Sequence, residues 1–156
     1  MLKGRLLHPE LVKALAAAGH GAKVLLADGN YPVSTKTPPG AARIYLNLAP
    51  GIVTVTDVLA VLVESIPIEA AEVMVPDAGP EPPIFEDFRR LLRQATTMGR
   101  TGGELPLRPL SRQAFYAAAS SEDVAVAVAT GERRVYANLL LTIGVVSPDD
   151  ASAGSR

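Results

Sequence analysis

The chain has no cysteine, no tryptophan and only two histidines among its 156 residues. Without cysteine it can form neither disulfides nor thiolate metal sites, and two histidines cannot supply a histidine-rich metal centre. The formal net charge is −1, so no basic surface indicates nucleic-acid binding. We therefore expect a protein that uses neither a metal ion nor a nucleic-acid partner.

Long apolar runs are also missing. No stretch reaches the roughly 18 residues of a membrane-spanning helix, and the first residues lack the basic-then-apolar pattern of a signal peptide. The turns carry neither G-x-G-x-x-G nor G-x-x-x-x-G-K-[ST], which argues against a nucleotide enzyme. We expect a cytoplasmic protein with no membrane contact and no organic cofactor.

Composition is otherwise that of a globular protein, with 48% apolar and 20% charged residues. The length favours one domain, which we place at residues 1–147. The last residues, 148–156, consist mostly of Asp, Ser, Ala and Gly, and we expect them to be a disordered tail.

Strand and helix signals alternate along the chain, which predicts an α/β protein with helices on both faces of a sheet. Helices are expected to begin near His8-Pro9, Thr54, Pro82-Pro83 and Ser111, with Gly19 as a left-handed cap of the first. The last two strands are joined by a short turn, which suggests that they pair antiparallel and that the sheet is mixed. Strands are expected at residues 23–27, 43–48, 71–75, 104–110 (a proline-interrupted edge strand), 124–129 and 136–141.

The stretch from Gly19 to Pro32 is the most informative part of the chain. His20 stands between two glycines, and the short apolar strand that follows ends at Asp28, where ligands of open α/β sheets collect. A strand rises about 3.3 Å per residue, so His20 and Asp28 lie at opposite ends of it. Either the glycine-flanked loop folds back, or the two residues serve one site from different subunits. In the structural alternative, Asp28 caps a turn and His20 has no chemical role.

Two further polar features stand out. Asn138 lies inside an apolar strand pattern, where an amide needs a hydrogen-bond partner, a backbone group or a ligand. Arg112 and Tyr116 are four residues apart on a predicted helix and share one face; they either contact a ligand or pack on each other at the surface.

Four blocks of this sequence together resemble the ribose pyranase / fucose mutarotase family. Each block is short, but their order and spacing match the family over the whole chain except the tail. The blocks are Leu2-Lys3-Gly4, Ala18-Gly19-His20-Gly21, Leu26-Ala27-Asp28-Gly29-Asn30-Tyr31-Pro32, and Gly131-Glu132 followed by Tyr136-Ala137-Asn138-Leu139-Leu140-Leu141 and Gly144-Val145.

The resemblance implies a small cytoplasmic protein with a mixed, roughly six-stranded sheet in a three-layer α/β/α fold. It implies a ring-shaped homo-oligomer, typically a decamer, with no cofactor. The activity that it implies is interconversion of the anomers, or ring forms, of a monosaccharide by general acid/base catalysis. A ribose-type pyranase and a non-catalytic, transport-associated sugar-binding protein of the same fold are the alternatives.

The resemblance also assigns roles to residues. His20 matches the family's proton donor, Asp28 its substrate-binding acid, and Tyr136 and Asn138 its substrate-binding Tyr-x-Asn motif. Arg112 matches a position that is Arg in fucose mutarotases and His in ribose pyranases, and Tyr116 and Tyr31 also resemble the fucose branch. The partner of His20 in proton transfer is Tyr136, Tyr116 or a water held by Asp28.

One position departs from the bacterial fucose enzymes. They commonly read Asp-Ala-His-Phe-Pro, where this chain has Asp28-Gly29-Asn30-Tyr31-Pro32. Ribose pyranases read Asp-Ala-Gly-Leu-Pro there. The aromatic Tyr31 therefore favours the fucose branch, although Asn30 replaces its histidine.

Overall fold

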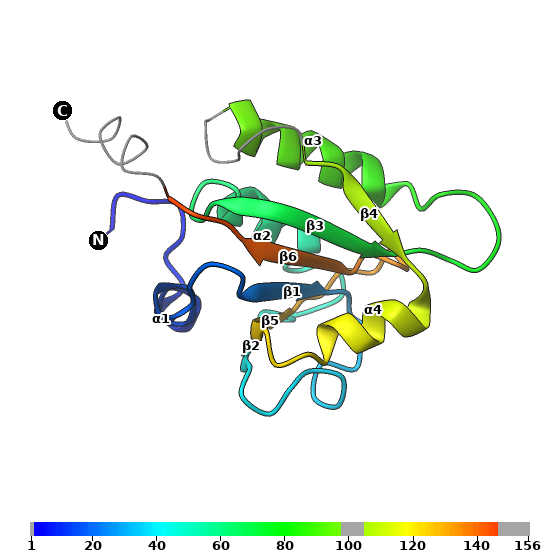
Figure 1. Cartoon of the computed structure of the whole chain (residues 1–156), viewed down its shortest axis with the longest axis horizontal. Coiled ribbons are helices and arrows are strands. Elements are labelled where there is room, and N and C mark those ends of the chain that lie inside the picture. The colour runs from blue at the N-terminus through cyan, green and yellow to red at the C-terminus, as the bar shows by residue number, and fades with distance from the viewer. Residues whose placement is uncertain (1, 98–104, 147–156) are drawn as a thin grey trace.

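The computed structural model describes residues 2–97 and 105–146, so the tail predicted at 148–156 lies outside the described residues. Helices and strands alternate as expected (Figure 1). The elements are α1 (Pro9–Ala17), β1 (Lys23–Ala27), β2 (Ala42–Tyr45), α2 (Val55–Leu62), β3 (Ile68–Met74), α3 (Ile84–Thr97), β4 (Leu107–Leu110), α4 (Arg112–Ala119), β5 (Val124–Ala129) and β6 (Leu139–Ile143). The segment at residues 2–8, before α1, contains no regular strand.

The six strands form one mixed sheet in the order β2-β5-β1-β6-β3-β4. β6 runs antiparallel to both of its neighbours, β1 and β3, whereas the other pairs are parallel. The carboxyl ends of the other five strands therefore meet at one edge of the sheet, which we call the carboxyl edge. The opposite edge, where β1 and β3 begin and β6 ends, is the amino edge. In Figure 1 the arrowheads of β1 and β3 point to the right and that of β6 to the left.

The mixed sheet is confirmed, but the reason given from the sequence was wrong. The last two strands do not pair with each other, because β1 lies between β5 and β6. The final strand also begins later than predicted, at Leu139, so Tyr136 and Asn138 belong to the connection that precedes it. β4, as predicted, is an edge strand.

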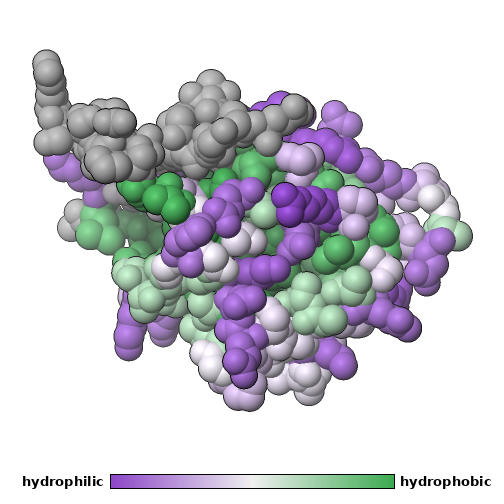
Figure 2. Space-filling view, viewed as in Figure 1, coloured by the Kyte–Doolittle hydropathy of each residue, from purple (hydrophilic) through white to green (hydrophobic). Residues whose placement is uncertain are grey.

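Helices cover both faces of the sheet and complete the predicted three layers. Apolar side chains of α1, α2 and α3 form the larger core on one face. Phe115 and Ala119 of α4 pack with Tyr31 and Val33 of the β1–β2 connection on the other face. Figure 1 shows α4 near the carboxyl edge, and Figure 2 shows hydrophilic side chains across the middle of the same face. The Lys23–Glu72 ion pair, with Nζ and Oε2 3.0 Å apart, bridges β1 and β3.

Local signals fix the ends of the helices, with one exception. α2 begins where the sequence predicted, after Thr54, which forms a reciprocal capping box with Asp57. At the end of α1, however, Ala18 is an extended cap and the left-handed glycine is Gly21, with φ of 81°. The prediction that Gly19 caps α1 in the left-handed conformation was therefore wrong. The chain turns after His20 rather than before it.

The three valines at alternate positions of β5 would share one face in a regular strand, but they do not. Val126 and Val128 enter the larger core, but Val124 packs in the smaller one. Lys23 pairs with Val124 and Val24 with Val126, so Ala125 is an extra residue in the ladder. A bulge reverses the alternation of side chains from that point.

Candidate functional site

A buried carboxylate–amide pair lies at the carboxyl edge. Asn138 Nδ2 donates to Asp28 Oδ2 at 2.9 Å, and the Asp28 backbone N–H donates to Asn138 Oδ1, also at 2.9 Å. Asp28 follows β1 and Asn138 precedes β6, so the antiparallel pairing of these strands brings the two residues together. The side chain of Asn138 thus has a defined orientation, because its two amide atoms contact one acceptor and one donor.

Burial raises the pKa of Asp28 above its ordinary value, and hydrogen bonds from Asn30, Ala137 and Asn138 oppose the shift. The Asn30 backbone N–H donates to Asp28 Oδ1 at 2.9 Å. Tyr31 also contributes a hydrogen bond that opposes the shift, so four donors face a carboxylate that has about four acceptor positions. Asp28 as a whole is only 4% exposed. These contacts fix the orientation of the Asp28 carboxylate at the carboxyl edge.

Arg112 and Tyr136 form a second pair beside it. Arg112 Nη2 donates to the Tyr136 hydroxyl at 2.9 Å, and the guanidinium carbon lies 5.7 Å from the ring centre. This hydrogen bond raises the pKa of Arg112, which keeps its positive charge. Tyr136 has a φ of 57°, in the left-handed region that residues other than glycine rarely adopt. The surrounding turn therefore holds Tyr136 in a backbone conformation that most residues avoid, as occurs at functional sites.

Tyr31 and Tyr116 form an aromatic pair, with ring centres 5.5 Å apart. Tyr31 is buried and its hydroxyl donates to the Lys36 carbonyl at 3.2 Å. Burial raises the pKa of Tyr31, so it stays protonated. Tyr116 is partly exposed, with Lys36 Nζ 5.6 Å from its ring centre. Arg112 contacts Tyr136 by a hydrogen bond and over its ring, a contact in addition to the two alternatives considered from the sequence.

The turn that carries Tyr136 is held by Glu132. This buried carboxylate accepts two hydrogen bonds from the Arg134 side chain, at 2.9 and 2.7 Å, and one from the Arg134 backbone N–H at 3.0 Å. Burial alone would raise the pKa of Glu132, but its hydrogen bonds with Arg134 outweigh this effect and lower it. Arg134 also reaches Asp87 of α3 at 3.0 Å, which ties the turn to the larger core.

Replacement of Gly131, which lies where two loops approach closely, is the first testable prediction. Its N–H donates to the Val53 carbonyl at 2.8 Å, and an added Cβ would lie within 3.0 Å of the Ala49 and Ile52 carbonyl oxygens. We expect Gly131→Ala to destabilise the fold by about 1–3 kcal/mol, as overpacking does. The melting temperature should fall by roughly 2–12 °C.

Gly40→Ala is the matched control, because a Cβ added there would have no atom within 4 Å and the φ of Gly40 is not positive. Its melting temperature should stay close to that of the wild type. An unchanged melting temperature for Gly131→Ala would contradict the close approach of these two loops.

His20 lies at the other end of the sheet. Its Nε2 is 2.9 Å from Glu69 Oε2, and the two side chains are 60% and 45% exposed. His20 precedes β1, whereas Asp28 follows it, and this strand of five residues spans about 15 Å. The loop does not fold back, so a single chain does not bring His20 to the carboxyl-edge residues.

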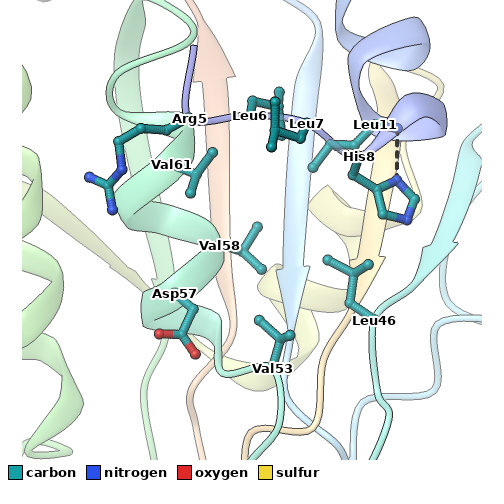
Figure 3. Close-up of a pocket in the computed structure, with 10 residues that line it drawn as sticks. All are labelled: Arg5, Leu6, Leu7, His8, Leu11, Leu46, Val53, Asp57, Val58 and Val61. Atoms are coloured by element: carbon teal, nitrogen blue, oxygen red, sulfur yellow. Dashed lines mark hydrogen bonds between the residues drawn. The ribbon is translucent and has the colours of Figure 1, made fainter. Parts of the chain in front are cut away.

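A separate pocket of about 230 Å³ lies between the segment at residues 5–8, α1, α2 and the end of β2 (Figure 3). Its polar lining groups have partners: Arg5 pairs with Glu64, His8 Nδ1 accepts from the Leu11 N–H, and Asp57 caps α2. The other lining residues are apolar. None of the predicted site residues lines this pocket, and its chemistry does not suit a polyhydroxyl ligand.

Within residues 2–97 and 105–146, no cluster of three His, Asp or Glu residues is arranged to hold a metal ion. In the same part of the chain, no helix is long and apolar enough to cross a membrane. Sequence reasoning missed Glu69 and Lys36. Glu69 was placed ahead of a strand expected at 71–75, and nothing local connected it with His20.

The fold and the carboxyl-edge cluster define a class of small α/β protein, in which a mixed sheet gathers polar groups at its carboxyl edge, the place where ligands of open α/β sheets commonly bind. The chain belongs to the RbsD / FucU transport protein family, whose model matches residues 1–146. The match covers every element of the sheet.

The relatives of this chain are named for one of two activities. A fucose mutarotase of Danio rerio is 35% identical, with 96% of this chain and 97% of the relative covered. A D-ribose pyranase of Paracidovorax citrulli is 33% identical, with 93% and 98% covered. The fucose mutarotase of Streptococcus pneumoniae, solved in complex with L-fucose, superposes with a TM-score of 0.74 at 27% identity and covers 94% of this chain and 100% of its own.

Proposed function

We propose that this protein is a sugar isomerase that interconverts the anomers of a monosaccharide. The observation that carries the proposal is the cluster of Asp28, Asn138, Arg112 and Tyr136 at one sheet edge, formed by two hydrogen-bonded pairs. Such a set offers acceptors and donors to the adjacent hydroxyls of a sugar. The full-length relation to fucose mutarotases and D-ribose pyranases supports it.

The reaction needs two proton transfers. A base removes the proton of the anomeric hydroxyl, whose electrons form the carbonyl, while an acid protonates the ring oxygen as its bond to the anomeric carbon breaks. Rotation of the carbonyl group and reversal of both transfers then yield the other anomer. Each positioned acid or base contributes about 10²–10⁴-fold.

In our proposal His20 is the acid, and Tyr136 is its partner. Arg112 Nη2 lies 2.9 Å from the Tyr136 oxygen, and its guanidinium stabilises the negative charge that this oxygen must carry before it takes the proton of the anomeric hydroxyl. Tyr31 is less suited, since its hydroxyl is buried and donates to the Lys36 carbonyl. Asp28 and Asn138 bind sugar hydroxyls, and Tyr116 covers an apolar face of the ring.

Assembly is part of the proposal, because His20 and Asp28 lie at opposite edges. A head-to-tail contact would bring the amino edge of one subunit to the carboxyl edge of the next, and such contacts close into rings. Exposed apolar residues flank both edges: Leu48 and Val135 on one side, Val145 on the other, with exposed fractions of 84%, 63% and 65%. We propose a closed homo-oligomer, a decamer as the family resemblance implies, that works in the cytoplasm.

Saturation-transfer NMR of anomer exchange across L-fucose, D-ribose and related aldoses tests the proposal. We expect the protein to accelerate exchange of at least one sugar. The second candidate is a sugar-binding protein without catalysis, which the separation of His20 from the binding residues within one chain favours. Binding of a sugar with no acceleration would establish that candidate instead.

Arg112 is expected to set the sugar preference, with L-fucose favoured. Its planar guanidinium can hold two oxygens at once, which an imidazole cannot. We expect Arg112→His to slow L-fucose exchange about tenfold or more, as for loss of a charged hydrogen bond, and to slow D-ribose exchange less. Exchange rates of both sugars by NMR check this.

Arg90→His is the control, because Arg90 pairs with Asp87 on the exposed side of α3. Its rates should match those of the wild type. An equal loss for both sugars in Arg112→His would indicate that Arg112 only supports the turn around Tyr136.

A further inference from the structure

The contact between His20 and Glu69 joins two segments that are 49 residues apart in the sequence. Among the described residues, His20 makes no other side-chain hydrogen bond. Both side chains lie at the amino edge, His20 before β1 and Glu69 at the start of β3, with the end of β6 between them. The contact therefore depends on how the three strand ends are arranged.

A β-bulge places Glu69. Ile68 pairs with Ile143 and Ala70 with Thr142, so Glu69 is the extra residue in the ladder. In a regular strand Glu69 would share a face with Ala71 and Val73, which are buried in the larger core. Because of the bulge, Ile68 rather than Glu69 faces the larger core, and the Glu69 carboxylate lies at the amino edge of the sheet. Bulges next to active sites commonly redirect a side chain in this way.

The loop of His20 is fixed to the same point. The Gly21 N–H donates to the Ile143 carbonyl at 2.9 Å, and the Ile143 N–H donates to the Ala22 carbonyl at 2.9 Å. Gly144, the next residue, leaves space for the acid, since a Cβ there would lie 3.3 Å from Glu69 Cβ. His20 and Glu69 are thus both positioned relative to one residue, Ile143.

We propose that Glu69 is the positioning residue of His20. A carboxylate only accepts hydrogen bonds, so the proton of the His20–Glu69 bond lies on Nε2. This fixes the tautomer and ring orientation and leaves Nδ1 as the nitrogen that exchanges a proton with the sugar. The inference rests on the proposed function for its kinetic consequence, but the tautomer can be measured without activity.

If Glu69 only stabilised the fold, removal of its carboxylate would lower the melting temperature. Both side chains are substantially exposed, and ion pairs in such places contribute little to stability. Removal of the carboxylate should therefore leave the melting temperature almost unchanged. A large effect on the exchange rate would then have to act through His20.

The kinetic experiment compares Glu69→Gln, Glu69→Asp, His20→Ala and the double variant His20→Ala/Glu69→Gln. We expect Glu69→Gln to slow L-fucose exchange about 10–100-fold, the range found for residues that orient a histidine ligand. Glu69→Asp should recover part of the rate, and the double variant should be no slower than His20→Ala. Glu64→Gln, which breaks the exposed pair with Arg5, is the control and should match the wild type.

Wild-type exchange in Glu69→Gln, or an additional loss in the double variant, would overturn the positioning role. If the wild type accelerates exchange of no sugar, the proposed function fails. The tautomer of His20 then tests the positioning role of Glu69 independently of activity. In His8→Asn protein labelled with ¹⁵N-histidine, His20 is the only histidine. We expect its neutral ring to carry the proton on Nε2, and Glu69→Gln to lose this preference; an unchanged tautomer would contradict the inference.

Discussion

Replacement of His20 with alanine is expected to slow anomer exchange by about two orders of magnitude or more, the loss typical for one general acid. The fold should be little affected, because the side chain is 60% exposed and its backbone contacts are made by the neighbouring residues Gly21 and Ala22. Exchange rates by NMR and the melting temperature, recorded on the same preparations, measure the two effects separately.

The matched control is His8, the other histidine. Its Nδ1 accepts a hydrogen bond from the Leu11 N–H at 3.3 Å and so caps α1. Asparagine is a good residue at this position, so His8→Asn should keep both the fold and the rate. If His20→Ala exchanges as fast as the wild type, the proposed acid is wrong and the sugar-binding alternative gains support. If it unfolds, His20 is structural.

Mixed oligomers are expected to regain activity that neither parent has. His20→Ala removes the acid at the amino edge, and Tyr136→Phe removes a hydroxyl at the carboxyl edge. If each site uses His20 of one subunit and Tyr136 of the next, a neighbouring pair has both residues in about one case in four in an equal mixture. Co-expression of the two variants should therefore restore about a quarter of the wild-type rate.

The control is a mixture of separately purified oligomers, which should stay inactive unless subunits exchange. Native mass spectrometry verifies that mixed oligomers are present. Mixed oligomers with no more activity than the parents would show that the site does not combine these two edges. A monomer mass at micromolar concentration, by analytical ultracentrifugation, would contradict the proposed ring directly.

Local chemistry explains which elements could be predicted from the sequence. The apolar run from Lys23 to Ala27 and the capping residues Thr54 and Asp57 gave β1 and the start of α2 as the structure has them. Pro109 and the other proline of its segment indicated an edge strand, and β4 is one. These features depend on residues a few positions apart, so a single sequence contains them.

Long-range pairing explains what could not be predicted. The short connection between β5 and β6 suggested a hairpin, but the strands lie on either side of β1. The bulges at Ala125 and Glu69 arise from the register with a neighbouring strand, which no local pattern specifies. The left-handed turn falls at Gly21 rather than Gly19 because the Gly21 N–H is bound to the distant Ile143 carbonyl.

The candidate site also has features that the sequence predicted and features that depend on long-range contacts. Asp28 and Asn138 stood out as polar residues at apolar strands, and the structure joins them by two hydrogen bonds. Strand length indicated that His20 and Asp28 are separated, but left open a loop that folds back; the structure excludes it, because His20 contacts Glu69 at the amino edge. The contact of Arg112 with Tyr136 depends on a left-handed residue in a turn, and sequence offered no sign of that geometry.

The central position of β6 has a consequence for biosynthesis. Without residues 139–143 the sheet separates into β2-β5-β1 and β3-β4, each with an open, apolar strand edge. β6 follows the other five strands of the described sheet in the sequence, so the two halves cannot join until residues 139–143 have been translated. Open edges of this kind favour aggregation. Nascent chains that stop before Leu139 should therefore depend on chaperones, and insertion of β6 between β1 and β3 should be the step that commits the chain to the folded state.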